Sequence, residues 1–184
     1  QKRFFYGSSI KVKHIDYLSL LKNKLPSISS DKIIILPCFP FSYWDMHIEP
    51  KNYKGVYGNK NFYTKFVAFW KKVEQIIEKS YKGKNITYIN HPQHLAKDRD
   101  KELTKKLVAK VGVLVPKSFP AKTLSEVFSL LDKGFKIFIK VRYGSMGKGI
   151  AYLEKGRWLT NFRFRNGRIL SKKSDYGWSF VNIT

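Results

Sequence analysis

Residues 140–150 read KVRYGSMGKGI, and this stretch decides the fold of the second half of the chain. Its three glycines (Gly144, Gly147 and Gly149) let the backbone turn sharply and bring several N–H groups against an anion. Residues 135–141 alternate apolar and polar and predict a strand before the turn, and residues 150–153 predict a return strand. The stretch therefore favours a glycine-rich flap between two antiparallel strands that can fold over phosphates. Taken alone, the same glycines also fit an ordinary hairpin turn.

Two better-known phosphate loops do not match these residues. A Walker A loop requires Ser or Thr directly after its lysine, but Gly149 follows Lys148. A dinucleotide-binding fingerprint requires a helix after its glycines, whereas a strand is predicted here. The loop therefore belongs to neither of these classes.

Four further sequence pieces come before the loop in a fixed order. They are Asn90-His91-Pro92, the helix-opening pair Asp100-Lys101, the run GVLVP at 112–116 that leads into a predicted strand, and Lys140 at the end of the strand before the loop. Together with the glycine loop, this order resembles the first half of the ATP-grasp core. In that family an Asn-x-Pro segment, an Asp-Lys pair, a Gly-Val/Ile-x-Val-Pro run and a lysine precede Gly-Ser-x-Gly-x-Gly. Arg142-Tyr143 departs from the family, in which proline is frequent at this point.

The resemblance implies a role for each matched residue. Lys101 and Lys140 correspond to two lysines that contact the phosphates of the nucleotide. The mobile loop that closes over the β- and γ-phosphates corresponds to Gly144, Ser145, Met146, Gly147, Lys148 and Gly149. The implied cofactors are ATP and Mg²⁺, and the implied activity joins a carboxylate to an amine or thiol through an acylphosphate. Because Glu154 and Asp175 are the only acids after the loop, we expect the metal ligands outside this chain, and no catalytic residue is assigned.

The fold class predicted is α/β, in two parts. Residues 1–92 are expected to form a small layered α/β domain that precedes the core. Its predicted strands are 2–6, 32–36 and 85–90, its helices are 14–24 and 62–81, and residues 37–61 are read as loop. The strand at 32–36 is almost entirely apolar, which is typical of a strand buried on both faces.

Residues 93–184 are expected to form the α+β first, nucleotide-phosphate-binding subdomain of an ATP-grasp core, apparently truncated. A helix over 97–111 should bury Leu103, Leu107, Val108 and Val111. Thr123 and Glu126 form a capping box that opens a short helix with Val127, Leu130 and Leu131 inward. A second hairpin is predicted from 158–165 to 168–173, with Asn166-Gly167 as its turn.

Composition leaves a second class of function open. Lys and Arg number 36 against 13 Asp and Glu, so the formal net charge is +23 and the chain should attract polyanions. A basic, aromatic-rich module that binds nucleic acid without catalysis is therefore the alternative, and a scaffold for a partner chain is a third possibility. No apolar run reaches the length of a membrane span. The single cysteine, Cys38, excludes an internal disulfide and fits a reducing, cytoplasmic environment.

Two groups of polar residues remain without a firm role. Asp45, His47 and Glu49 alternate within the predicted loop, where they could contact a substrate or contribute to a metal site. His91 and His94 flank Pro92 at the expected domain junction, where local packing explains them more simply. The carboxylate substrate, the oligomeric state and the role of the 45–49 group stay open at this point.

Overall fold

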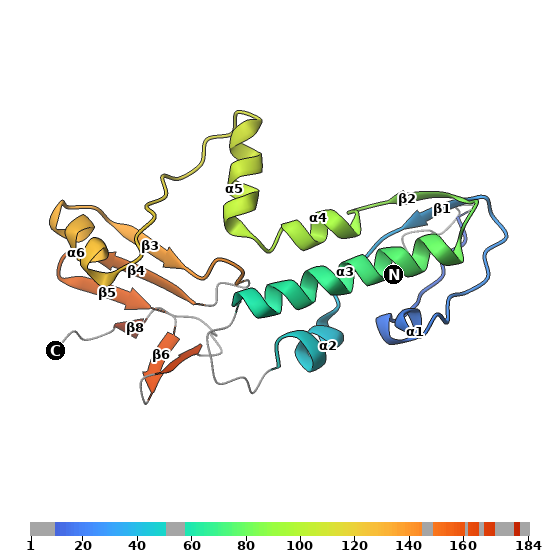
Figure 1. The fold of residues 1–184 in the computed structure, drawn as a ribbon, viewed down its shortest axis with the longest axis horizontal. Coiled ribbons are helices and arrows are strands. Elements are labelled where there is room, and N and C mark those ends of the chain that lie inside the picture. Colours follow the sequence, from blue (N-terminus) through green and yellow to red (C-terminus); the bar gives the residue numbers. More distant parts are fainter. Residues whose placement is uncertain are drawn as a thin grey trace.

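The computed structural model describes residues 10–50, 58–144 and 149–160, together with the backbone of 162–165, 168–171 and 179–180. Its helices and strands form a mixed α/β fold, as predicted, with two separate hydrophobic cores. Figure 1 shows one part built around the long helix α3 and a second part built around a β-sheet. The predicted strand at 2–6 lies outside the described residues.

The first part contains the elements α1 (Tyr17–Leu21), β1 (Lys32–Ile35), α2 (Phe41–Tyr43), η2 (Trp44–Ile48), α3 (Lys60–Ser80), β2 (Asn85–Tyr88) and α4 (Pro92–Lys97). The second part contains α5 (Lys101–Lys110), α6 (Leu124–Asp132), β3 (Ile137–Lys140), β4 (Ile150–Glu154), β5 (Arg157–Thr160) and β8 (Ser179–Phe180), with β6 (Phe162–Arg165) and β7 (Arg168–Ser171) as a separate pair.

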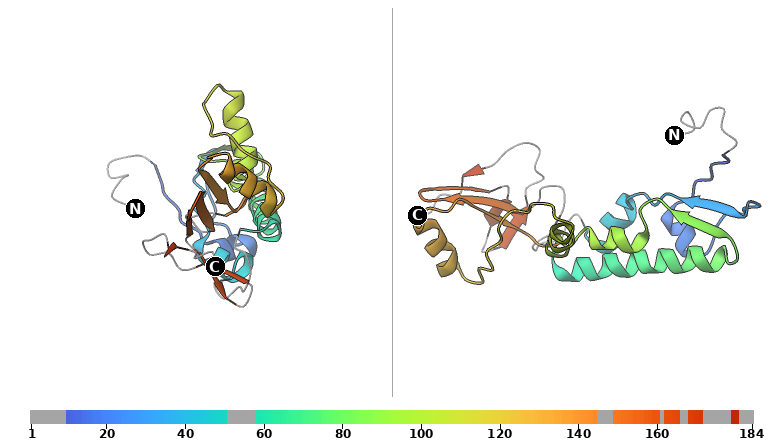
Figure 2. Two further views of the ribbon diagram at one scale, coloured as in Figure 1. Left: turned by 90° about the vertical axis from the view of Figure 1, so that its left-hand side faces the viewer. Right: turned by 90° about the horizontal axis from the view of Figure 1, so that it is seen from above.

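Helix α3 organises the first core, and the prediction of a helix at 62–81 is confirmed. Asn59 caps its start by accepting a hydrogen bond from the Phe62 N–H at 3.1 Å. The predicted apolar stripe is buried: Phe62, Phe66, Phe69, Val73, Ile76 and Ile77. Helix α4 packs against α3, and its Ala96 belongs to the same core, which therefore reaches past the expected boundary at residue 92. Figure 2 shows α4 lying alongside α3.

Strands β1 and β2 pair in parallel, but the expectation that the first of them is buried on both faces is wrong. Ile33 is 6% exposed and faces the core, whereas the next residue, Ile34, is 62% exposed. Among the described residues, the two-stranded sheet is covered on its α3 side and not on the other, so alternate residues of β1 are exposed. Helix α1 is also shorter than the predicted 14–24, and within it Leu20 is the buried residue.

The interpretation of 37–61 as loop is also wrong for its described part. Residues 41–48 form the short helix α2 and the π-helical turn η2, closed by a hydrogen bond from the Glu49 N–H to the Trp44 carbonyl at 2.9 Å. The turn puts Trp44 and Ile48 into the core, at 8% and 1% exposure. Aromatic packing rather than a helical sequence period therefore orders this segment.

The single helix predicted at 97–111 is two helices, α4 and α5, with a break at residues 98–100. None of its four expected core residues is buried, and Val111 is 77% exposed. The run 112–116 is irregular instead of leading into a strand, and Leu114 is 98% exposed. Within the described part of the chain, nothing covers this face of α5. The apolar period therefore predicted a helix here correctly, but the expected burial of its apolar residues is wrong.

The second core lies between α6 and the sheet. The capping box is present, with Thr123 accepting from the Glu126 N–H at 3.2 Å and the Glu126 carboxylate accepting from the Thr123 N–H at 3.3 Å. Val127 and Leu131 pack on strands β3 and β4, which pair antiparallel as predicted, in the strand order β3-β4-β5-β8. The second predicted hairpin is confirmed only for β6 and β7, since β5 pairs with β4. No described helix is both long and apolar enough to cross a membrane.

We expect the substitution Thr123→Ala to lower the free energy of unfolding by about 0.5–2 kcal/mol, because the first turn of α6 loses its side-chain cap. Chemical denaturation monitored by circular dichroism measures this loss. Ser125→Ala is the matched control, since Ser125 lies in the same turn without a capping bond and should change stability by less than about 0.5 kcal/mol. Equal losses in the two variants would contradict the assigned role of the capping box.

Candidate phosphate-binding site

A buried carboxylate joins the start of α5 to the end of β3. Asp100 is 5% exposed and caps α5 by accepting hydrogen bonds from the N–H groups of Glu102 and Leu103 at 3.1 and 3.2 Å. Arg142 donates to both oxygens of the same carboxylate, from Nε at 2.8 Å and from Nη2 at 2.6 Å. The hydrogen bond from Arg142, followed by those from the backbone, holds the pKa of Asp100 below its usual range.

Lys101 is directed at the backbone of the glycine loop. Its ammonium donates to the carbonyls of Val141 at 2.9 Å and Arg142 at 3.4 Å, and also to that of Gly144. Burial lowers the pKa of Lys101, and the nearby charges of Arg99 and Lys140 lower it further. Lys101 therefore fixes the first part of the loop in this structure, instead of presenting its donors to an open site.

Lys140 has a different environment. It is the last residue of β3, pairs with Ile150 across the hairpin, and has an exposed side chain. Its ammonium lies 5.5 Å from the ring centroid of Phe138, and it forms no hydrogen bond or ion pair within the described residues. Lys140 is therefore the cation at this hairpin whose donors remain directed to solvent.

The described start of the loop packs closely on the first part of the molecule. Tyr143 stacks on Tyr63 of α3 with ring centroids 4.3 Å apart and an interplanar angle of 14°. At Gly58, φ is +71°, and a Cβ there would lie 2.5 Å from the Gly144 nitrogen and 2.9 Å from the Tyr143 carbonyl carbon. Only a glycine fits this close approach of two backbones. Of the predicted loop residues, Ser145, Met146, Gly147 and Lys148 lie outside the described residues.

Arg99 is a buried cation that the sequence patterns did not single out. It is 8% exposed, and its guanidinium carbon lies 3.9 Å from the ring centroid of Trp44 and 5.2 Å from those of Phe39 and Phe66. Burial lowers the pKa of Arg99, and the neighbouring charge of Glu49 opposes this shift. Its Nη1 is buried and has no hydrogen-bond partner in the part of the chain that the structure describes. No local pattern marks Arg99, because its aromatic surroundings come from distant segments of the chain.

The described residues near the loop are better suited to bind the phosphates of a nucleotide than to bind the Mg²⁺ that accompanies it. Lys101 contacts the start of the loop, and the charges of Arg99 and Lys140 each lower its pKa after the larger effect of burial. Glu154, however, is engaged by the Tyr152 hydroxyl at 2.8 Å and by Lys136 and Arg157 at 3.6 and 3.5 Å. Asp175 lies outside the described residues. Glu154 is therefore a poor candidate ligand for Mg²⁺.

The group at 45–49 does not form the metal site considered from the sequence. Asp45 and His47 lie in η2, and the His47 ring packs 4.6 Å from that of Tyr43. Glu49 is 8% exposed and accepts a hydrogen bond from the Gly58 N–H at 2.9 Å, so it holds the segment that meets the loop. In the part of the chain that the structure describes, the one carboxylate–histidine group with metal-ligand spacing lies elsewhere, on α3 and at the start of α4.

Comparisons with known proteins give no match. No protein-family model matches the chain, and no curated protein and no solved structure matches it. The resemblance to ATP-grasp ligases therefore remains a prediction from the order of the five sequence pieces.

We expect Gly58→Ala to destabilise the chain more than Gly134→Ala. Both glycines have positive φ, at +71° and +81°, so each alanine incurs a backbone cost of about 1–2 kcal/mol. Only at Gly58 does the added Cβ also collide with the loop, since nothing lies within 4 Å of it at Gly134. Thermal unfolding measures the difference, and near-ultraviolet circular dichroism reports loss of the Tyr63–Tyr143 stack. Equal melting temperatures and unchanged spectra would contradict this packing.

We expect the Asp100 carboxylate to make stability depend on acid pH. Because its pKa is lowered in the folded state, its contribution is fully present above the unfolded pKa, about 3.9, and is lost as pH falls through the folded pKa. The difference in unfolding free energy between the wild type and Asp100→Asn should therefore be largest near neutral pH and shrink toward pH 2. Asp132→Asn is the control, because Asp132 is exposed and pairs only with the exposed Lys155. A pH-independent difference for Asp100→Asn would contradict this role.

Proposed function

We propose that this chain supplies the nucleotide-phosphate-binding part of an ATP-dependent ligase of the ATP-grasp type, which joins a carboxylate to an amine or thiol. The observation that carries the proposal is the attachment of the Asp100-Lys101 helix start to the loop between β3 and β4. This attachment joins two of the pieces on which the family resemblance depends, although they lie about forty residues apart in the sequence. The phosphates would lie beside the glycine loop.

The residues at this site divide into positioning groups and a binding group. Asp100 binds Arg142, and Lys101 binds the carbonyls of Val141, Arg142 and Gly144, so the two residues hold the described start of the loop. Lys140 is the cation with donors left for a phosphate oxygen, and charge-assisted hydrogen bonds of this kind are among the stronger ones in proteins. The family resemblance implies that both Lys101 and Lys140 contact the phosphates, whereas in this proposal Lys101 positions the loop and Lys140 contacts the phosphates.

Arg99 supports an anion at this site through its charge. A guanidinium that is nine-tenths buried, with one nitrogen lacking a hydrogen bond, adds positive potential where Lys101 already has a lowered pKa. The charges of Arg99 and Lys140 act unfavourably on the Lys101 ammonium, and an anion bound beside Lys101 would offset that effect. ATP with Mg²⁺ supplies the phosphoryl group that activates a carboxylate. This chain's residues would bind and orient the phosphates.

The proposal is tested by calorimetric titration of the chain with MgATP and MgADP. We expect weak binding, because the proposed site contacts the phosphates of the nucleotide and the described residues provide no assigned contact to its adenine. Lys140→Ala should weaken it about tenfold, the loss of one charge-assisted hydrogen bond. Lys133→Ala removes the same charge from the end of α6 and should leave the affinity unchanged.

The alternative function predicts a different outcome. Polynucleotide binding that survives about 200 mM salt, without any binding of nucleotide, would favour a nucleic-acid-binding module, for which the net charge of +23 is the supporting observation. Equal effects of Lys133→Ala and Lys140→Ala on MgATP affinity would indicate that only net charge matters, which would also contradict the proposed site.

A further inference from the structure

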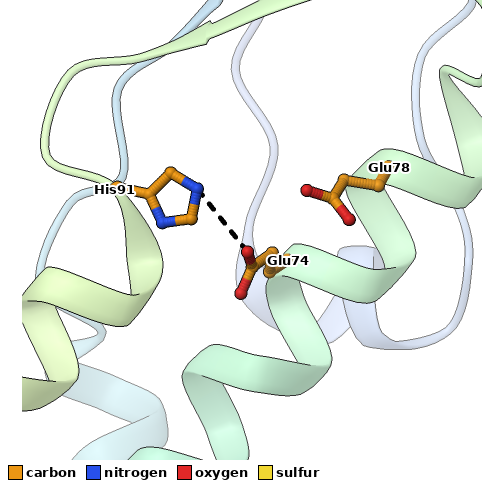
Figure 3. Close-up of side chains that lie close together, drawn as sticks. All are labelled: Glu74, Glu78 and His91. Atoms are coloured by element: carbon orange, nitrogen blue, oxygen red, sulfur yellow. Dashed lines mark ion pairs between the residues drawn. The ribbon is translucent and has the colours of Figure 1, made fainter.

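Three side chains with metal-ligating atoms meet where α3 faces the start of α4. Glu74 and Glu78 lie one turn apart on α3, and His91 comes from the segment between β2 and α4 (Figure 3). One ligand atom from each residue lies within 4.8 Å of the other two. Figure 3 shows both carboxylates and the imidazole directed into the same space.

The charges at this cluster are unusual for so basic a chain. The molecule has 36 Lys and Arg residues, yet neither Glu74 nor Glu78 forms an ion pair with any of them within the described residues. Glu74 is 8% exposed, and it interacts with the His91 Nε2 at 3.5 Å and with the Gln93 side-chain amide at 3.0 Å. Two neighbouring carboxylates repel one another, and a cation between them would remove that repulsion.

A nearby hydroxyl provides a second, independent observation. The Tyr88 hydroxyl oxygen is buried and has no hydrogen-bond partner among the described residues, and the Tyr88 ring packs on His91 with centroids 4.7 Å apart. Burial, followed by the charges of Glu78 and Glu74, raises the pKa of Tyr88 to about 12, so this hydroxyl lies in the field of the two carboxylates. Because the Tyr88 ring packs on His91, a water bound to an ion at this cluster could give the hydroxyl a hydrogen-bond partner.

We propose that Glu74, Glu78 and His91 bind a divalent first-row transition metal ion, with Zn²⁺ as the best match. One imidazole nitrogen and two carboxylate oxygens form a mixed ligand set that suits this ion and leaves a fourth position for water. Gln93 then acts as the outer partner that orients the Glu74 carboxylate. The ion would bind the β2–α4 junction to α3 and stabilise the first part of the molecule.

The hydrogen bonds of His91 indicate which ring nitrogen carries the proton before and after a metal ion binds. The Gln93 N–H donates to the His91 Nδ1 at 3.4 Å, so in the metal-free ring Nε2 carries the proton and faces Glu74. Binding through Nε2 requires that this proton moves to Nδ1, and the Gln93 N–H then loses its acceptor. A contact as long as 3.4 Å is a weak hydrogen bond, so little is lost. No net proton needs to leave the ring.

This site is separate from the proposed nucleotide site. Tyr63, which stacks on the loop residue Tyr143, precedes Glu74 on α3 by eleven residues, about 16 Å along the helix axis. Zinc binding therefore does not depend on the proposed function, and failure of either proposal leaves the other standing.

The test is a calorimetric titration of the metal-free chain with Zn²⁺, with Co²⁺ as a spectroscopic substitute. We expect one saturable site, a zinc-dependent rise in melting temperature, and a visible Co²⁺ absorption typical of low coordination number. Glu78→Gln and His91→Gln should each weaken zinc binding about tenfold or more. Asp132→Asn and His47→Gln remove a carboxylate and an imidazole elsewhere and should leave the affinity unchanged.

Two variants keep the test independent of folding. Glu78 is exposed on α3, so Glu78→Gln should preserve the circular dichroism spectrum and melting temperature of the metal-free chain. His91→Gln also removes the cap of α4, and its fold is checked by the same spectrum. Absence of saturable zinc binding in the wild type would overturn the proposal. An unchanged zinc affinity in folded Glu78→Gln would also overturn it, as would a loss of zinc affinity in His47→Gln equal to the loss in His91→Gln.

Discussion

Asp100 places one carboxylate, 5% exposed, between the N-terminus of α5 and the guanidinium of Arg142. The rest of the candidate site depends on this contact. It orients α5 so that Lys101, the next residue, can reach the carbonyls of the loop, and it fixes the strand end that presents Lys140. A buried carboxylate needs this many donors, because removing it from water without hydrogen bonds costs several kcal/mol. The geometry of the loop is therefore tied to the start of a helix forty-two residues away.

The cations of the site are held in three different ways. Arg99 lies against aromatic faces, Lys101 is surrounded by backbone carbonyls, and Lys140 stays in solvent beside Phe138. The charge of Glu49 acts on Arg99 and that of Asp100 acts on Lys101, so each of these two cations is partly balanced inside the protein. Water screens charges least where they are buried, so Arg99 and Lys101 would attract an anion mainly through their positive charge. Lys140, which is exposed, would contact the phosphate directly.

Helix α3 connects the two regions of chemical interest. Its first turns contact the loop through Tyr63, and its last turns present Glu74 and Glu78 to His91. A buried apolar stripe runs along its length. The two carboxylates lie at i and i+4 on this helix. Only the fold brings a histidine from another element against it.

The features that could be predicted from the sequence are those encoded in local spacing: helix α3, the capping box of α6, and the antiparallel strands β3 and β4. Such features follow from periodicity and backbone preference, which neighbouring residues set among themselves. Tertiary structure alone decided which apolar faces are covered, because Ile34, Val111 and Leu114 are exposed although their patterns are those of core residues. It also decided that Lys101 binds carbonyls and that Arg99 lies among Phe39, Trp44 and Phe66. Burial and charge pairing depend on segments far apart in the chain, and no local pattern encodes those distances.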